Sequence, residues 1–548
     1  MFRPVALVVL VSTGCAPTQA GLAAPDARLP RLPPTRWTAE QQATHLLNRL
    51  AFGPSQRDRE LLRELGPQRW LAEQLTPGVD PAMEHRLSDF KTLKLSVAEA
   101  FAAYPPVPQQ LEQAGVDPRS ADGAEAKERL RRMLKEHPEA LPAQLLVEST
   151  QARLLRAALS RRQLEEVLVE FWFNHFNVSA EKNRTRWMVT AYERDAIRPH
   201  VFGRFRELLG ATAKHPAMLW YLDNWMSTRE GFVRPRPHGA PADGEEAAVP
   251  RVLGLNENYA RELMELHTVG VNAGYAQDDV REAARALTGW SIVVNPRQAR
   301  FGQFVFHPQA HDQGEKHVFG LTIPAGGGQG DAEALLDHLA RHPATARFLA
   351  RKLCQKFVAD EPPPALVERV AAEFLRTDGD LTATYLAIFQ SPEFWSDEAF
   401  AAKTKTPLEF VVSAVRSVGT LDEVQLPLAR ALESLGQPLY RCGPPTGWAE
   451  VAAPWVSAGA LVTRIGFGLR LAEGQVTGVE VELPPVQASP EATLDAVALA
   501  VLGRPASPAT RATVLRALTA REDDGEQRQV EPRVVAGLLL GSPEFQKQ

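Results

Sequence analysis

The sequence predicts an all-α protein, mainly helical and built from many helices, with one small β-hairpin insertion near residues 301–322. Apolar residues recur at helical spacing through most of the chain, for example at Leu164, Leu168 and Phe171. Patterns with a period of two are scarce, and only the stretch FGQFVFHPQAHDQGEKHVFGLTI places two aromatic and β-branched runs on either side of a turn. We therefore expect at least half of the chain to be helical.

The composition is that of a folded protein without a nucleic-acid partner. The chain has 548 residues, of which 44% are hydrophobic and 23% charged, as in ordinary globular proteins. Its 61 Lys and Arg residues face 66 Asp and Glu residues, which gives a net charge of -5. This balance supplies no positive field for polyanions.

The first 24 residues predict export. A basic Arg3 is followed by an apolar run, Val5 to Val11, that is too short for the roughly 20 residues of a membrane span. The segment Ser12-Thr13-Gly14-Cys15 resembles a lipobox, although Ser12 stands where Leu is usual. Two alternatives follow: lipidation of Cys15, or an ordinary signal peptide cut near Ala20 or Ala24. We expect a periplasmic or outer-membrane-anchored lipoprotein, otherwise a secreted protein, that meets the membrane only through a lipid anchor.

The rest of the chain divides into three parts. Residues 25–36 are rich in Pro and Arg and predict a tether, residues 37–335 an N-terminal helical region with the polar motifs, and residues 336–548 a C-terminal helical region. Because AIFQSPEF and GLLLGSPEF end two similar stretches, 347–394 and 494–545 are candidates for a duplicated helical unit. The alternative is that Ser-Pro-Glu is only a common helix-start signal.

After export only Cys354 and Cys442 would remain beside Cys15. They could form a disulfide in an oxidising compartment or stay buried as small apolar residues. Their separation in the sequence does not decide between these alternatives.

The densest polar motif is GLNENYARELMELHTVGV, residues 254–271. It predicts a helix with Asn256 at its N-cap, and we expect the 256–267 helix to lie at the protein's centre with little solvated face. At about 100° per residue, four side chains share one stripe while His267 points to the other side. These four side chains are those of Asn258, Arg261, Glu262 and Glu265.

The stripe is the first candidate catalytic site. Glu262 and Glu265 could perform acid–base chemistry, with Arg261 holding an anionic group. If the helix is buried, these carboxylates need partners, and we expect Arg261 and groups near Asn174, His175 and Asn224 to supply them. The structural alternative is that Arg261 and Glu265 form an ordinary pair one turn apart.

A second candidate is His175, which shares a face with Leu168, Phe171 and Trp172 in the stretch 164–182. Its structural alternative is a buried neutral histidine bonded to a backbone carbonyl. Other polar groups could act with it in binding, although Asn and Asp also cap helices and polar turn residues are usually solvated. These groups are Asn174, Asn177, Asn224, Asn256, Asn258, His267, His311 and Asp312, with Glu193 and Lys316 nearby.

Several familiar signatures are absent from the sequence. There is no Cys-x-x-Cys-His, no Gly-x-Ser-x-Gly, no phosphate-binding loop and no His-Glu-x-x-His. The sequence therefore identifies no metal and no cofactor.

Six motifs together resemble the bacterial family catalogued as domain of unknown function 1800 (DUF1800). The resemblance spans roughly residues 40–545 and implies an exported, mainly helical protein. It also implies a partner protein similar to the sulfatase and alkaline-phosphatase superfamily, encoded beside it, but no catalytic residue. The motifs are HLLNRLAFGPS (45–55), FWFNHFNVS (171–179), HPAMLWYLDN (215–224), NENYARELMELHTVGV (256–271), DDVREAARALTGW (278–290) and LGQPLYRCGPPTGW (435–448).

Two functions from different classes remain. The first is an envelope or secreted enzyme that acts on an extracellular polymer or polysaccharide through the Glu262 stripe. The second is a non-catalytic envelope protein for binding, export or assembly, whose polar motifs are buried networks that fix helix packing. A cofactor-bearing protein is a third and weaker hypothesis.

The lipid anchor leads to a direct prediction. We expect Cys15→Ser to release the protein from the membrane fraction, because the acyl chains would be its only hold on the bilayer. Fractionation of cells that produce each form measures this. An unchanged membrane-bound share in the variant would contradict lipidation.

Overall fold

The computed structural model describes residues 29–113, 124–233, 254–424, 426–519 and 530–548. These ranges do not include the predicted signal peptide, Cys15, the first residues of the predicted tether and most of the loop before Leu253. Helices make up 59% of the structure, so the prediction of a mainly helical fold is confirmed. None of the described helices combines the length and apolar character that a membrane span needs.

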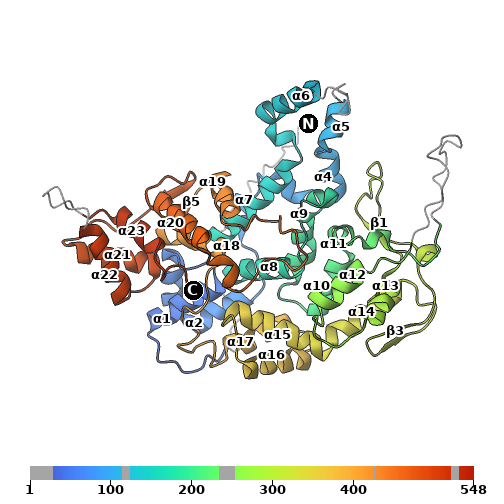
Figure 1. Cartoon of the computed structure of the whole chain (residues 1–548). Helices are drawn as coiled ribbons and strands as arrows, with labels where there is room; N and C mark the ends of the chain where they lie inside the picture. Colours follow the sequence, from blue (N-terminus) through green and yellow to red (C-terminus); the bar gives the residue numbers. More distant parts are fainter. Residues whose placement is uncertain (1–28, 114–123, 234–253, 425, 520–529) are drawn as a thin grey trace, which may run out of the picture.

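The N-terminal helices include an arm that projects from the body. The arm is formed by α4 to α6, and α7 and α8 run from its base into the middle of the molecule (Figure 1). The capping box of Thr38 fixes the start of α1. These helices are α1 (Ala39–Leu50), α2 (Gln56–Leu75), α3 (Pro81–Arg86), α4 (Val97–Ala103), α5 (Val107–Gln113), α6 (Ala124–Glu136), α7 (Ala143–Leu159) and α8 (Gln163–His175).

The middle of the chain forms one end of the body and contains two π-helices, Tyr192–Ile197 and Leu263–His267 (Figure 1). Such helices are rare and often lie at functional sites. Each continues an α-helix, so the 256–267 stretch is not one straight helix. The α-helices here are α9 (Val189–Ala191), α10 (Phe205–Lys214), α11 (Pro216–Tyr221), α12 (Asn258–Glu262), α13 (Gln277–Leu287) and α14 (Gln329–Arg341).

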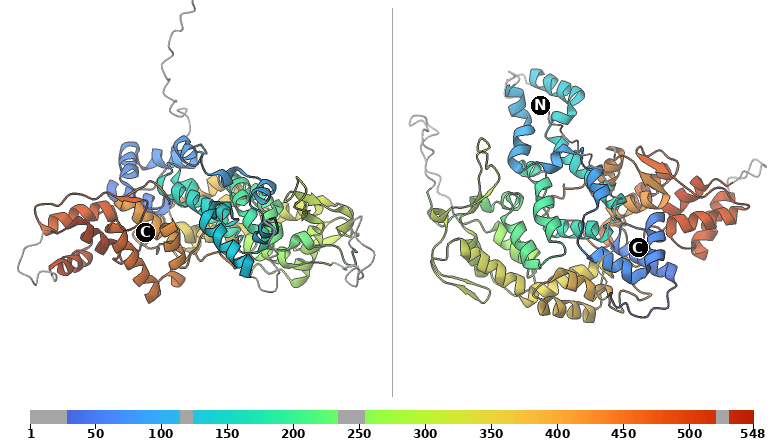
Figure 2. Two further views of the ribbon diagram at one scale, coloured as in Figure 1. Left: turned by 90° about the horizontal axis from the view of Figure 1, so that it is seen from above. Right: turned by 180° about the vertical axis from the view of Figure 1, so that it is seen from behind.

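The C-terminal helices return to the N-terminal ones. Figure 2 shows α1 and α2 beside the last helices, and Arg416 of α18 donates to the carbonyl oxygen of Gly53 and pairs with Asp58 of α2. Helices from both predicted regions thus build one core. The helices are α15 (Pro343–Phe357), α16 (Pro364–Arg376), α17 (Leu381–Phe389), α18 (Pro407–Val418), α19 (Leu426–Ser434), α20 (Ala458–Ala472), α21 (Pro490–Leu502), α22 (Pro508–Thr519) and α23 (Pro532–Leu540).

Within the described ranges, β structure is limited to three two-stranded antiparallel sheets. β1 (Trp290–Ile292) pairs with β2 (Phe304–Phe306), β3 (Lys316–Val318) with β4 (Leu321–Ile323), and β5 (Gly419–Leu421) with β6 (Val479–Val481). The two runs in 301–322 were expected to pair with each other, and this pairing is wrong. The first run pairs with the strand after α13, and the second folds back on itself.

The two Ser-Pro-Glu-Phe segments have the same local geometry. In each, the serine hydroxyl accepts a hydrogen bond from the phenylalanine backbone N–H, at 3.2 Å for Ser391 and 3.3 Å for Ser542. Phe394 and Phe545 are both buried, and each segment follows three helices. The helix packing differs, since α16 lies against α15 and α17 whereas α21 lies directly against α23. The duplication stays a prediction.

Two further predictions concern the tether at residues 25–36 and the cysteines Cys354 and Cys442. Residues 29–36 have no regular secondary structure, and Leu32 packs against the core. Cys354 and Cys442 are buried and not joined in a disulfide. Burial raises the pKa of the Cys354 thiol to about 12, so it is protonated at neutral pH.

Candidate functional site

One group of the candidate residues lies on or beside α8, a helix with a buried polar stripe. Glu166, Glu170 and Asn174 follow one another at four-residue spacing and so lie along one face. Glu166 and Asn174 are buried, and the Glu170 side chain is 13% exposed. Because ionised carboxylates are costly to bury alone, each needs a partner from another element.

The partners of the two glutamates are arginines. Arg198 forms a bidentate pair with Glu166, with two hydrogen bonds of 2.8 Å. Arg153 of α7 donates to Glu170 at 2.6 Å and to Glu193 of the first π-helix at 2.5 Å. The stripe therefore joins α7, α8 and the π-helix through charged pairs.

Glu193 lies at the centre of this network. Tyr440 donates to it at 2.7 Å, and Arg198 approaches it at 3.3 Å. Burial acts to raise the pKa of Glu193, but Arg153 and Arg198 outweigh it and lower the pKa to about 2. Glu193 is thus a fixed anion at neutral pH.

A cavity of about 290 Å³ opens over Glu193 and Tyr440. Its lining includes Ser149, Thr190 and Arg156. This volume is at the lower end of the range of small-molecule sites. The polar run Tyr192-Glu193-Arg194 is only a weak signal for this cavity in the sequence.

Asn174 and Asn177 hold the segment 441–448 rather than facing a cavity. The Asn174 amide donates to the Trp448 carbonyl oxygen at 2.8 Å and accepts from the Trp448 N–H at 2.6 Å. Asn177 donates to the carbonyl oxygens of Cys442 and Pro444 at 3.1 and 2.7 Å. Both side-chain amides thus satisfy backbone groups of this segment that would otherwise need backbone partners.

A glycine makes this contact possible. Gly447 has φ of +72°, and an added Cβ would lie 2.3 Å from the Asn174 carbonyl oxygen. Any other residue would be both strained and in collision there. The Gly447-Trp448 pair of the sixth motif is therefore explained by its contact with α8.

His175 has the geometry of the structural alternative. Its Nε2 lies 3.1 Å from the His267 carbonyl oxygen and must donate, so Nδ1 accepts from the Lys352 Nζ at 3.1 Å. Burial, then the Lys352 charge, holds the pKa of His175 well below its usual value. The same causes lower the pKa of His267 to about 3.

The other asparagines also bind backbone. Asn224 donates to the carbonyl oxygens of Leu287 and Trp290, Asn256 to that of Asp223, and Asn258 to that of Leu222. The helix starts at Asn258, two residues after the predicted cap, and the Asn256 side chain accepts from the Asn258 N–H at 3.0 Å. Asn256 and Asn258 thus connect the start of α12 to the segment after α11, and Asn224 connects that segment to α13 and β1.

The predicted carboxylate stripe, on α12 and the second π-helix, lies at the surface, so the prediction that this helix lies at the protein's centre is wrong for that face. The apolar residues Tyr259, Leu263 and Met264 are buried, but Arg261 and Glu265 are half-buried and 3.6 Å apart. Arg261 also donates to Gln277 at 2.8 Å. The expected contacts of this stripe with Asn174, His175 and Asn224 are not made, because those side chains are occupied elsewhere.

Glu262 differs from its neighbours. Within the described ranges its carboxylate makes no hydrogen bond or ion pair. Burial, then the nearby Glu265, raises its pKa, and Arg261 opposes this only in part. A half-buried carboxylate with a raised pKa is a candidate acid or base.

His311 and Asp312 were expected on a solvated turn, and for His311 this is wrong. His311 and Lys316 are buried, and both bind Asp331, at 3.1 and 2.7 Å. Asp312 pairs with Arg285 at 2.9 Å. The α14 carboxylate draws this loop inward, which the local sequence pattern did not indicate.

Metal binding has no geometric support here. Among the described residues no group of three or more His, Cys, Asp or Glu side chains could hold a metal ion. The motif residues instead pair with backbone groups and with arginine or lysine.

Fold and site define a mainly helical protein whose motif residues form buried polar networks around α8. Residues 45–547 match the model of a protein family of unknown function, DUF1800, and the chain belongs to this family. No curated protein and no solved structure shows significant similarity to it.

The Glu193 network leads to a prediction about pH. Because the folded-state pKa is about 2, below the ordinary value of 4.5, Glu193 stabilises the fold above pH 4.5 and loses this effect as pH falls toward 2. We expect Glu193→Gln to lower the free energy of unfolding by a few kcal/mol at pH 7. The difference from wild type should shrink below pH 4.5, as measured by urea unfolding. A difference that does not depend on pH would contradict the assignment.

Proposed function

We propose that the protein is an exported envelope protein that binds a partner or a polymer without catalysing a reaction. The proposal rests on one observation: the polar side chains of the motifs form hydrogen bonds within the protein. Asn174, Asn177, Asn224, Asn256 and Asn258 all donate to backbone carbonyl groups. Side chains engaged in this way are not available to bind a substrate.

His175 supports the same proposal. It is 2% exposed, and both ring nitrogens have partners. A general acid or base must reach the proton that it transfers. His175 instead links α8 to the second π-helix through His267 and to α15 through Lys352.

The partner and the location belong to the proposal. The resemblance stated above implies a neighbouring protein similar to the sulfatase and alkaline-phosphatase superfamily, which is the first protein to test for binding. Export and the lipid anchor at Cys15 would place both at the envelope.

The second candidate function is acid–base catalysis on an extracellular polymer by Glu262. It is favoured by the raised pKa of Glu262 and by the lack of an ion-pair partner within the described ranges. Tyr221 lies close enough for the Glu262 charge to act on it, but burial is the main cause of its raised pKa.

Glu262→Gln separates the two functions. Removing a desolvated charge that repels Glu265 should leave the melting temperature unchanged or slightly higher. Glu257→Gln is the matched control, because Glu257 pairs with Arg261 at 3.4 Å and with Gln277 at 2.6 Å. We expect that variant to melt at a slightly lower temperature.

The mature chain should be screened for binding and for turnover of anionic and neutral polysaccharides. The proposal predicts no turnover by wild type, and equal binding by wild type and Glu262→Gln. Turnover by wild type that is lost in Glu262→Gln at an unchanged melting temperature would overturn the proposal and support catalysis.

A further inference from the structure

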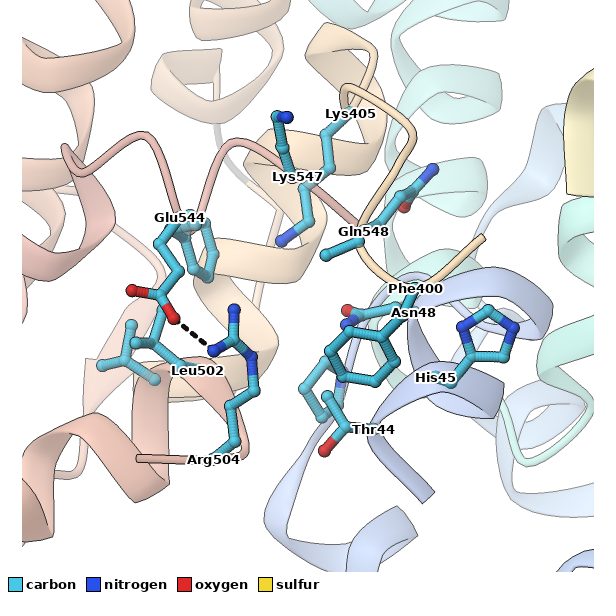
Figure 3. Close-up of a pocket in the computed structure, with 14 residues that line it drawn as sticks. Thr44, His45, Asn48, Phe400, Lys405, Leu502, Arg504, Glu544, Lys547 and Gln548 are labelled. Atoms are coloured by element: carbon cyan, nitrogen blue, oxygen red, sulfur yellow. Dashed lines mark ion pairs between the residues drawn. The ribbon is translucent and has the colours of Figure 1, made fainter. Parts of the chain in front are cut away.

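A small cavity of about 20 Å³ lies where α1, the segment 400–405 and the end of the described chain meet (Figure 3). It lies away from α8 and is independent of the proposed function. It is lined by the first motif, through His45 and Asn48, and by the second Ser-Pro-Glu-Phe segment, through Glu544 and Phe545. A cavity of this size holds one water-sized group.

Lys405 is a buried cation without a counter-ion at this cavity. It is 2% exposed, and its Nζ lies 3.7 Å from the centre of the Phe545 ring. In the part of the chain that the structure describes, the Lys405 amine makes no hydrogen bond or ion pair. Figure 3 shows the side chain reaching into the pocket.

Other donors face the same space. The Asn48 amide has no hydrogen-bond partner among the described residues, and Arg504 lies opposite it (Figure 3). Arg504 pairs with Glu544, the only side-chain carboxylate among the residues that line the pocket, and Lys547 is exposed at its rim. Among the side chains that line the pocket, three cations therefore face one carboxylate.

The surrounding packing keeps this arrangement in place. The backbone N–H of Lys405 donates to Gln546 at 2.9 Å, and its carbonyl oxygen accepts from Arg464 at 2.9 Å. His45 packs its ring against Phe394, at 4.6 Å between ring centres. Phe545 thus lines the cavity, and Phe394 packs against His45, which lines it too.

We propose that this cavity binds one anionic oxygen of a ligand's carboxylate or phosphate group, with Lys405 as the charged donor and Asn48 and Arg504 as further donors. An anion would supply the counter-charge and the hydrogen-bond acceptor that the Lys405 amine lacks.

Binding should be linked to proton uptake. Burial lowers the pKa of Lys405 to about 7, with Glu409 opposing and Arg464 adding to the effect. A bound anion favours the protonated amine and raises this pKa. The charged and titratable groups that face Lys405 are His45 from α1, Glu409 from α18, Arg464 from α20, Arg504 after α21, and Glu544 and Lys547 after α23.

These neighbours do not compete for the proton. Burial, then Arg49, holds the pKa of His45 well below its usual value, although a contact with the Phe394 backbone opposes this. Burial acts to raise the pKa of Glu409, but Lys356 lowers it to about 2. Near neutral pH, Lys405 is therefore the group that titrates.

The experiment is calorimetry on the full mature chain with sodium acetate and, separately, inorganic phosphate, at constant ionic strength in buffers of different ionisation heat. Because a bound anion favours the protonated amine, we expect proton uptake on acetate binding that increases from pH 7 to pH 8. Affinity should fall about tenfold between pH 8 and pH 9. The anion that binds identifies the ligand class.

Lys405→Met should abolish binding, while Lys547→Met is the matched control, because it removes a lysine from the rim and leaves the cavity amine. We expect the control to weaken binding less than threefold. Binding of neither anion by wild type, binding without proton uptake, or equal loss in both variants would overturn the proposal. The proton uptake of wild type tests it even if Lys405→Met does not fold.

Discussion

The burial of a polar stripe on α8 is the constraint on which the rest of the structure depends. Glu166, Glu170 and Asn174 occupy one face of a helix whose other side chains are mostly apolar and buried. Removing the partner of a buried charge costs about 3–5 kcal/mol. Arg198, Arg153 and the Trp448 backbone must therefore be held in place, and with them the first π-helix, α7 and the segment 441–448.

The irregular parts of the fold follow from the same constraint. Both π-helices contact Phe176. Its carbonyl oxygen accepts a hydrogen bond from the Tyr192 hydroxyl at 2.9 Å, and its ring centre lies 5.1 Å from that of His267. The sharp turn at Gly447 lets the backbone approach Asn174. The π-helices and the Gly447 turn both bring polar backbone groups against α8.

The sequence was sufficient to predict the helices and the burial of His175, because both depend on local periodicity. It was not sufficient for the pairing of β2 with β1 or for the burial of His311, since both depend on contacts with distant elements such as Asp331. The carboxylate stripe lies on one face of its helix, but the predicted burial of that face was wrong. Depth depends on what covers a face, and the amphipathic pattern alone does not show that. Lys405 lacked any local signal, since its burial comes from Phe545 and Gln546.

Amide hydrogen exchange of the segment 441–448 in wild type and in Asn174→Ala tests most directly whether the motif residues support the fold. If Asn174 holds this segment, exchange of the Trp448 N–H should accelerate at least tenfold, and the free energy of unfolding should fall by about 2 kcal/mol or more, because buried backbone groups lose their partners. Unchanged exchange and stability, together with loss of ligand binding or of a catalytic activity, would contradict the account.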